Sequence, residues 1–415
     1  MIWTRKSSPD APADRNKLLG LDLTASRARA VAVTGGHSRA LEWEPGRHDL
    51  MMFLGLERRT PELGRNGYAI CRKHPHLVCT NFLPCLGLAR EWRGSRLTLS
   101  PETALAATFD AMRAPIVAEA DGFAMVLPSY LTASQVKTVN ELATKAKLPL
   151  RGTAIMPLAI AAHRAASVLN PKSESKDSAT HRPDWVVPIR TAEAGPGAVV
   201  IIDVDEYALS ATTVFVDRSE VRILSAGAWP RVSLKVWKDR LIDSLSDRCV
   251  RLCRRDPRDS ADAEQSMYEQ LDAALDAMRA AQPATLTVRA EKWYQDIVQQ
   301  PAEFDGYCAS LVNLAWDNIR EVISTANLPL PPRAVWLTDT AAKLPGLAAM
   351  LYQNSAEQTE VAMLPIDAAT EAAAALHARW LAATLPRTHL DRAIPIEVPT
   401  ETVFKTTKRG VPSAK

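Results

Sequence analysis

The sequence predicts an α/β protein with two lobes around a central cleft, in which one layout of strands and helices is used twice. The first observation is a pair of apolar runs, Leu18 to Leu23 and Arg29 to Val33, which ends in a Gly-Gly pair and is typical of a strand hairpin. The second is a similar start at Ala198 to Asp203, after a polar segment at 170–197. Helices and further strands follow both starts, so we expect two halves of one kind, although no repeat is visible in the sequence itself.

Length and charge narrow the class of protein. The chain has 415 residues, enough for about two to three domains. Lys and Arg total 50 against 47 Asp and Glu, and the net charge of +3 gives no reason to expect a nucleic-acid partner. No window reaches the ~20 apolar residues of a membrane helix, and residues 1–17 are polar, so we expect a disordered lead-in and a cytoplasmic protein. Six irregularly spaced cysteines fit free thiols in a reducing compartment.

The first lobe is expected at 18–169. Ser100, Pro101 and Glu102 are typical of a helix start, because Ser caps the helix, Pro fits its first position and Glu suits its first turn. That helix is expected to run to about Met112. The further elements of this lobe are a buried strand at Phe123 to Leu127, stopped by Pro128, and helices at Thr132 to Ala146 and Thr153 to Leu169.

The second lobe is expected at 198–361, after a linker at 170–197 that is rich in Ser, Lys, Pro and Gly. Residues 362–400 are expected to return to the first lobe, and 401–415 to form a basic, solvated tail. The expected elements are strands at Ala198 to Asp203, Ala211 to Val216, Val221 to Leu224 and Ala334 to Leu337, and helices at Ser233 to Arg254, Ala261 to Ala281, Trp316 to Ala326, Leu344 to Gln353 and Thr370 to Ala383.

Five short segments between Leu18 and Ala383 carry a family resemblance. They are Leu19 to Ser26 (Leu-Gly-Leu-Asp-Leu-Thr-Ala-Ser), Leu127 to Leu131 (Leu-Pro-Ser-Tyr-Leu) followed by Met156 to Ala159, Ile202 to Val204, Val335 to Leu337 followed by Lys343 to Pro345, and Asp367 to Ala374. In order and separation they resemble the nucleotide-binding domain of the DnaK-type (70-kilodalton heat-shock) chaperones, in the actin-like ATPase superfamily. The resemblance implies a duplicated actin-like ATPase fold, and no segment matches that family's substrate-binding domain.

The resemblance also implies a site for ATP and Mg²⁺ in the cleft. Asp22 and Asp203 match positions that hold the metal in the family. Carboxylates suit Mg²⁺ because it prefers oxygen ligands. The residues that fall at nucleotide-binding positions are Asp22, Thr24, Ser26, Asp203, Ser210, Asp339, Thr340 and Lys343.

The phosphate-binding loops depart from the family pattern. In the first loop the family has one Gly and two Thr, and this chain has Thr24, Ala25 and Ser26, so the glycine that lets the backbone approach a phosphate is lost. In the second loop Asp205 and Glu206 stand where the family's polyphosphate lies. Two like charges at close range near a protein surface repel each other by about a few kcal/mol, so these carboxylates disfavour a polyphosphate. The family's catalytic lysine aligns near Leu83, in a segment without lysine. These changes predict weak or lost hydrolysis.

The predicted function is a heat-shock-chaperone-like or scaffold subunit that holds a protein partner or client without hydrolysing ATP. Two alternatives stay open. One is an ATP-binding chaperone ATPase, which should bind ATP with Mg²⁺. The other is an actin-like cytoskeletal or pilus-assembly adaptor, which should polymerise or bind a short peptide of a membrane partner.

A second candidate site is a zinc centre at Cys71, His74, His76 and Cys79. Thiolate and imidazole are the ligands that zinc prefers, but this spacing is not one of the common zinc-binding patterns. The alternative is an ordinary segment of the first lobe.

Overall fold

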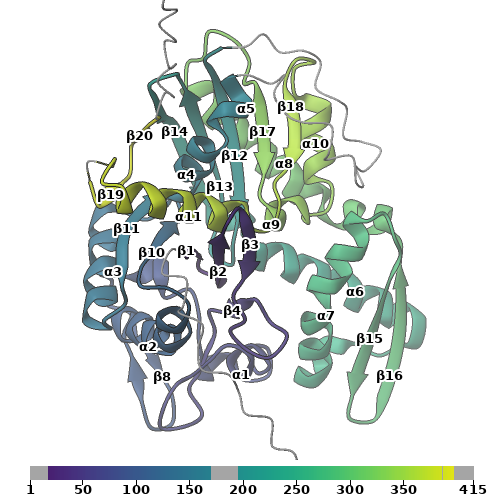
Figure 1. The fold of residues 1–415 in the computed structure, drawn as a ribbon. Coiled ribbons are helices and arrows are strands. Elements are labelled where there is room, and N and C mark those ends of the chain that lie inside the picture. Colours follow the sequence, from purple (N-terminus) through teal and green to yellow (C-terminus); the bar gives the residue numbers. More distant parts are fainter. Residues whose placement is uncertain (1–16, 170–194, 386, 397–415) are drawn as a thin grey trace, which may run out of the picture.

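The computed structural model describes residues 17–169, 195–385 and 387–396. Two β-sheets flanked by helices make up the molecule, one from each expected lobe (Figure 1). The expected basic tail, nearly all of the lead-in and most of the linker lie outside the described residues. None of the helices in the described ranges is long and apolar enough to cross a membrane.

The first sheet has seven strands within the described residues, in the order β19-β11-β10-β1-β2-β3, with β4 also paired to β2. β1 runs antiparallel to β2 and parallel to β10, which in turn runs parallel to β11. The central strands read as apolar runs because helices cover both faces. The strands are β1 (Leu18–Leu23), β2 (Arg27–Thr34), β3 (His37–Ala40), β4 (Asp49–Met51), β10 (Phe123–Leu127), β11 (Leu150–Ile155) and β19 (His389–Leu390).

The second sheet has six strands within the described residues, in the order β18-β17-β12-β13-β14-β20. β12 runs antiparallel to β13 and parallel to β17. The order and directions of β14-β13-β12-β17-β18 thus match those of β3-β2-β1-β10-β11. The strands are β12 (Gly197–Val204), β13 (Leu209–Val216), β14 (Glu220–Trp229), β17 (Ala334–Leu337), β18 (Glu360–Met363) and β20 (Ala393–Pro395).

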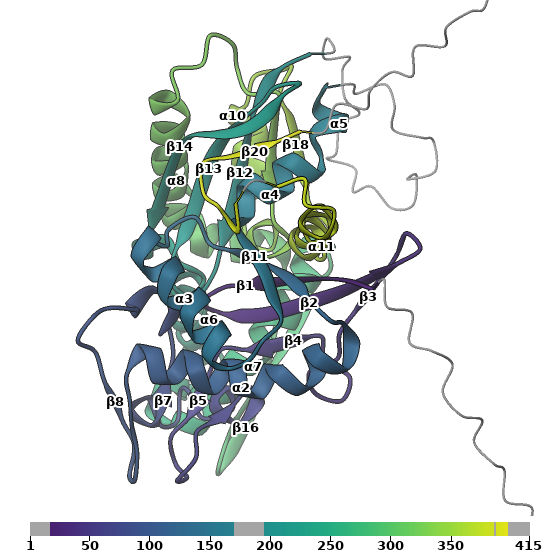
Figure 2. The ribbon, with the colours of Figure 1, turned by 60° about the vertical axis from the view of Figure 1, so that its left-hand side comes forward.

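Two helices, α4 (Met156–His163) and α11 (Ala368–Leu381), lie between the sheets (Figures 1 and 2). The first six residues of α4 are apolar and buried on all sides, as expected of a core helix. One apolar cluster joins these helices to Val126 of the first sheet and to Val199 and Trp336 of the second. This shared core fixes the two sheets relative to each other.

The remaining elements lie around the two sheets. In the first lobe these are α1 (Arg65–Tyr68), α2 (Pro101–Glu119), α3 (Ala133–Lys145), the short strands β5 (Leu54–Gly55), β6 (Glu62–Leu63), β7 (Val78–Cys79), β8 (Trp92–Arg93) and β9 (Thr98–Leu99), and the 3₁₀ turns Pro75–Leu77 and Leu83–Cys85. The short helix α5 (Ala165–Leu169) follows α4 and contacts β13 of the second sheet. In the second lobe they are α6 (Leu234–Cys253), α7 (Ala261–Arg279), β15 (Ala284–Ala290), β16 (Trp293–Gln299), α8 (Pro301–Thr325), α9 (Asp339–Ala342), α10 (Leu347–Asn354) and the 3₁₀ turns Pro230–Val232 and Pro257–Asp259.

Several expected boundaries are wrong. Residues 153–155 belong to strand β11, not to a helix, because β11 pairs along its length with β10. α8 begins at Pro301, well before the expected Trp316, and a capping box of Gln300 and Glu303 fixes that start. The β15–β16 hairpin was not expected at all. Of the expected return segment, α11 packs on the first sheet and β19 joins it, whereas β20 pairs with β14 of the second.

A glycine on β1 permits the close packing of α11. A Cβ atom added at Gly20 would lie 1.9 Å from the carbonyl oxygen of Thr370. We expect Gly20→Ala to lower the free energy of unfolding by about 3 kcal/mol or more, measured by denaturant titration. Gly306→Ala, in an open position on α8, is the control and should raise it by about 0.5–1 kcal/mol. Equal effects of the two substitutions would contradict the packing.

Candidate functional site

A cavity of about 700 Å³ lies between the two lobes. Its size is that of a small-molecule pocket. Among the described residues it is lined by eight carboxylates and six basic side chains. The carboxylates are those of Asp22, Asp49, Asp203, Glu206, Glu269, Asp272, Asp276 and Asp339. The basic side chains are those of Arg27, Arg29, Arg47, Arg65, Lys238 and Lys343.

The two hairpin loops at the cavity bond directly to each other. The backbone N–H of Ala25, in the β1–β2 loop, donates to the Asp205 carboxylate at 3.0 Å. In the reverse direction, the N–H of Glu206 donates to Ser26 Oγ at 2.6 Å. Tyr130 Oη also donates to Asp205, at 2.5 Å. The two loops are thus joined directly by protein groups.

The Asp205 carboxylate is saturated with donors. Its second oxygen accepts the N–H groups of Tyr207 at 2.9 Å and Ala208 at 3.0 Å. Burial raises the pKa of Asp205 to about 6, and the Tyr130 hydroxyl opposes part of that rise. Backbone N–H groups from both lobes converge on one anion, which is the arrangement that binds phosphate in glycine-rich loops.

Asp22 and Asp203 lie on the first strand of each hairpin and both line the cavity. Asp203 accepts a hydrogen bond from Thr338 Oγ1 at 2.7 Å. Asp22 is only 6% exposed, and its Oδ1 has no hydrogen-bond partner among the described residues. Burial raises the pKa of Asp22 to about 7, while Arg27 lowers it in part. Burial also raises the pKa of Asp203.

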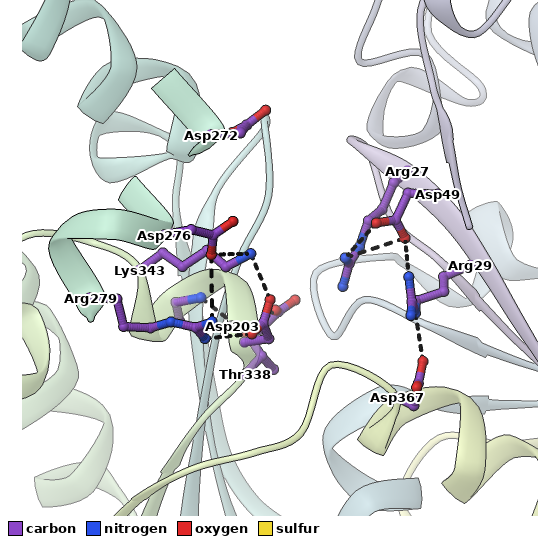
Figure 3. Close-up of polar contacts among 12 residues, drawn as sticks. Arg27, Arg29, Asp49, Asp203, Asp272, Asp276, Arg279, Thr338, Lys343 and Asp367 are labelled. Carbon is purple, nitrogen blue, oxygen red and sulfur yellow. Dashed lines mark hydrogen bonds and ion pairs between the residues drawn. The ribbon is translucent and has the colours of Figure 1, made fainter. Parts of the chain in front are cut away.

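The second-lobe wall carries a network of ion pairs (Figure 3). Lys343 Nζ lies 2.9 Å from Asp339 and 3.1 Å from Asp276. Arg279 bonds to the same Asp339 carboxylate at 2.6 Å. Two of these residues, Asp339 and Lys343, stand at positions that the resemblance assigns to adenosine binding.

The facing wall, in the first lobe, has its own network (Figure 3). Arg29 bonds to Asp367 at 2.6 Å and to Asp49 at 3.1 Å. Arg27 is more loosely held, at 3.4 Å from Asp49. Both arginines extend from β2, two residues apart and therefore on one face of the strand.

A buried lysine of the second lobe also lines the cavity. Lys238, on α6, is 1% exposed and lies 2.9 Å from Asp272 and 3.7 Å from Glu206. Its ammonium also lies 5.0 Å from the ring centre of Tyr268. Tyr68 of the first lobe reaches the same Asp272 at 3.4 Å, so this cluster joins the lobes.

Seven of the eight nucleotide-site residues expected from the sequence line this one cavity. They are Asp22, Thr24, Ser26, Asp203, Asp339, Thr340 and Lys343. Ser210 does not, because it lies in β13 opposite Asp203 and is 4% exposed. Their roles toward ATP or Mg²⁺ stay predictions.

The sequence reasoning missed Arg27, Arg29, Tyr130 and Lys238. A signal existed for Lys238, since it stands four residues after Leu234 and three before Leu241, within an apolar stripe. Arg29 lies directly opposite Asp22 in the β1–β2 register, which places it beside the cavity. No local signal marks Tyr130, whose partner lies 75 residues away.

The structure does not assemble the expected zinc centre. Cys71 lies against Gln265, and Cys79 is buried in β7 opposite Leu54. His74 and His76 are exposed around a 3₁₀ turn. No group of three or more His, Cys, Asp or Glu side chains that could hold a metal occurs in the described ranges. The segment turns the histidines outward while its cysteines pack inward, so the zinc expectation finds no support.

Loss of the Asp205 carboxylate should remove the hydrogen bonds that join the β1–β2 and β12–β13 loops. We expect Asp205→Ala to lower the free energy of unfolding by about 3 kcal/mol or more, since it leaves several buried donors unpaired. Tyr130→Phe removes one of these bonds and should cost about 1 kcal/mol. Denaturant titration measures both. An Asp205→Ala effect no larger than that of Tyr130→Phe would contradict the shared anchoring role.

The raised pKa of Asp22 predicts a pH dependence. The unfolded chain releases this proton near the ordinary pKa of 3.8, whereas the folded chain keeps it until about pH 7. The folded state therefore binds more protons across this window, and stability falls as the pH rises. We expect Asp22→Asn to abolish this fall, so the variant gains up to about 4 kcal/mol over wild type between pH 4 and pH 8.

Thermal or denaturant unfolding over that pH range measures the difference, with Asp110→Asn, an exposed position on α2, as the control substitution. A difference between Asp22→Asn and wild type that does not change with pH would show that Asp22 is ionised in the folded protein throughout.

No model of a known protein family matches the sequence. No curated protein matches it either. A function for the cavity is therefore inferred from the charges and contacts of the residues that line it.

Proposed function

We propose that this protein has a duplicated actin-like fold and acts as a non-hydrolysing, chaperone-like or scaffold subunit that holds a protein partner. The matching order and directions of five strands in each sheet support the fold. The position of the cavity between the lobes, at the ends of β1 and β12, fits the same proposal.

The observation that carries the loss of nucleotide chemistry is the hydrogen bond between Ala25 and Asp205, which joins the two hairpin loops. A phosphate bound at these loops would need the same N–H donors. The carboxylate already holds them, and an intramolecular group competes at a high effective concentration. In this proposal Asp205 is a permanent substitute for the phosphate.

Three further features support the same conclusion. The cavity lining has eight carboxyl groups against six Lys and Arg side chains among the described residues, so it offers no excess of positive charge for a polyphosphate. Leu83, at the position of the family's catalytic lysine, is buried and apolar. The Lys343 and Arg279 ion pairs occupy the expected adenosine side.

Mg²⁺ has only part of a site here. Asp22 and Asp203 supply two carboxylates, and protein-bound Mg²⁺ in nucleotide sites takes further ligands from phosphates and water. With the phosphate donors engaged by Asp205, these residues alone do not fit a Mg²⁺–nucleotide complex. The proposed partner-holding role therefore needs neither.

Calorimetric titration of the full chain with ATP and ADP, with and without Mg²⁺, tests the proposal. We expect no binding at millimolar nucleotide, because the phosphate donors are occupied. Micromolar binding that depends on Mg²⁺ would overturn the proposal and favour a chaperone ATPase.

A variant sharpens this test. Asp205→Gly frees the N–H groups of Ala25, Tyr207 and Ala208, so it should bind inorganic phosphate more tightly than wild type. Asp110→Asn, which removes a carboxylate far from the loops in sequence and outside the cavity lining, should not. Equal phosphate binding by all three proteins would show that Asp205 does not occupy a phosphate position.

A further inference from the structure

Two buried carboxylates of the cavity have no basic side chain within ion-pair distance in the described ranges: Asp22 and Asp203. The other buried carboxylates that line it are paired, Glu206 with Lys238 and Asp339 with Lys343. A buried ionised carboxylate is unfavourable unless it is paired and hydrogen-bonded. The inner cavity therefore lacks positive charge at one place, which Asp22 and Asp203 define.

The two carboxylates also have unused capacity to accept hydrogen bonds. Asp22 is 6% exposed, lines the cavity and leaves its Oδ1 without a donor. Asp203 accepts a hydrogen bond from Thr338 Oγ1. The Arg27 charge lowers the pKa of both carboxyl groups, but the Arg27 guanidinium bonds to Asp49 at 3.4 and 3.5 Å. Acceptors for at least one further donor group remain.

The chemistry of the lining favours an organic cation over a metal ion. No group of three His, Cys, Asp or Glu side chains that could ligate a metal occurs in the part of the chain that the structure describes, so a metal ion would have only these two carboxylates and water. An alkylammonium group has a single charge and three N–H donors, which suits two carboxylates on one side of a cavity. Met156, Ile160 and Leu275 also line this cavity and offer an apolar surface for a short alkyl chain.

We propose that the cavity binds an alkylammonium group, with the nitrogen held by Asp22 and Asp203 and the alkyl chain against the apolar lining. The group comes either from a small free amine or from a lysine side chain of a peptide. The inference rests on the proposed function in one respect, namely that Asp205 already occupies the phosphate donors.

Calorimetric titration of the full chain at pH 8 with n-butylamine tests this site, with n-butanol as the uncharged control of similar shape. We expect butylamine to bind and butanol not to bind. Asp22→Asn and Asp203→Asn should each weaken binding about tenfold or more, the loss of one charged hydrogen bond. Asp110→Asn, outside the cavity, should leave it unchanged.

Two further ligands distinguish the sources of the amine. Tighter binding of 1,4-diaminobutane than of butylamine supports a free diamine. Tighter binding of Nα-acetyl-lysine methylamide supports a peptide lysine. Either result requires the same dependence on Asp22.

The inference is overturned if butylamine binds no better than butanol, if Asp22→Asn and Asp203→Asn both leave amine binding intact, or if Mg²⁺ alone binds at Asp22 and amines do not. A parallel titration with Mg²⁺ and ATP separates the two proposals. Nucleotide binding would overturn the proposed function, whereas loss of amine binding without nucleotide binding would overturn only this inference.

Discussion

The structure depends on the packing of α11 and α4 between the two sheets. Gly20 lets α11 approach the backbone of β1, and a shared apolar core then holds both sheets in one orientation. That orientation directs the ends of β1 and β12 toward each other. The contact between Ala25 and Asp205 follows from it, as does the placing of Asp22 and Asp203 on one cavity.

Charge then decides what this cavity can hold. Most acids on its walls are neutralised by lysines and arginines of the protein itself, in the networks around Asp339 and Asp49. Such internal pairs stabilise the walls only modestly where they meet solvent. Under the proposed function, their larger consequence is that these lysines and arginines are already engaged by carboxylates of the protein. Asp22 and Asp203 are left with acceptor capacity, which gives the cavity a preference for positive charge.

The lobes are also joined away from the loops. Arg72, next to α1, bonds to Asp239 of α6 and to Glu264 of α7, and its guanidinium lies 4.5 Å from the ring centre of Tyr268. Together with Asp205 and the Tyr68–Asp272 bond, these contacts connect the lobes on two sides of the cavity. Relative motion of the lobes would have to break buried or half-buried polar contacts, so the two lobes are held together without a bound nucleotide.

The sequence by itself determined the α/β class, the two strand hairpins and most of the long helices, because apolar periodicity and caps such as Ser100 are local signals. It also indicated the aspartates at the strand ends and the unusual Asp205-Glu206 pair. It could not determine the length of α8, the β15–β16 hairpin or the partners of Asp205. Tertiary structure decided these, because Tyr130 and Ala25 lie 75 and 180 residues from Asp205, and only the packing of both sheets on α4 and α11 brings them together.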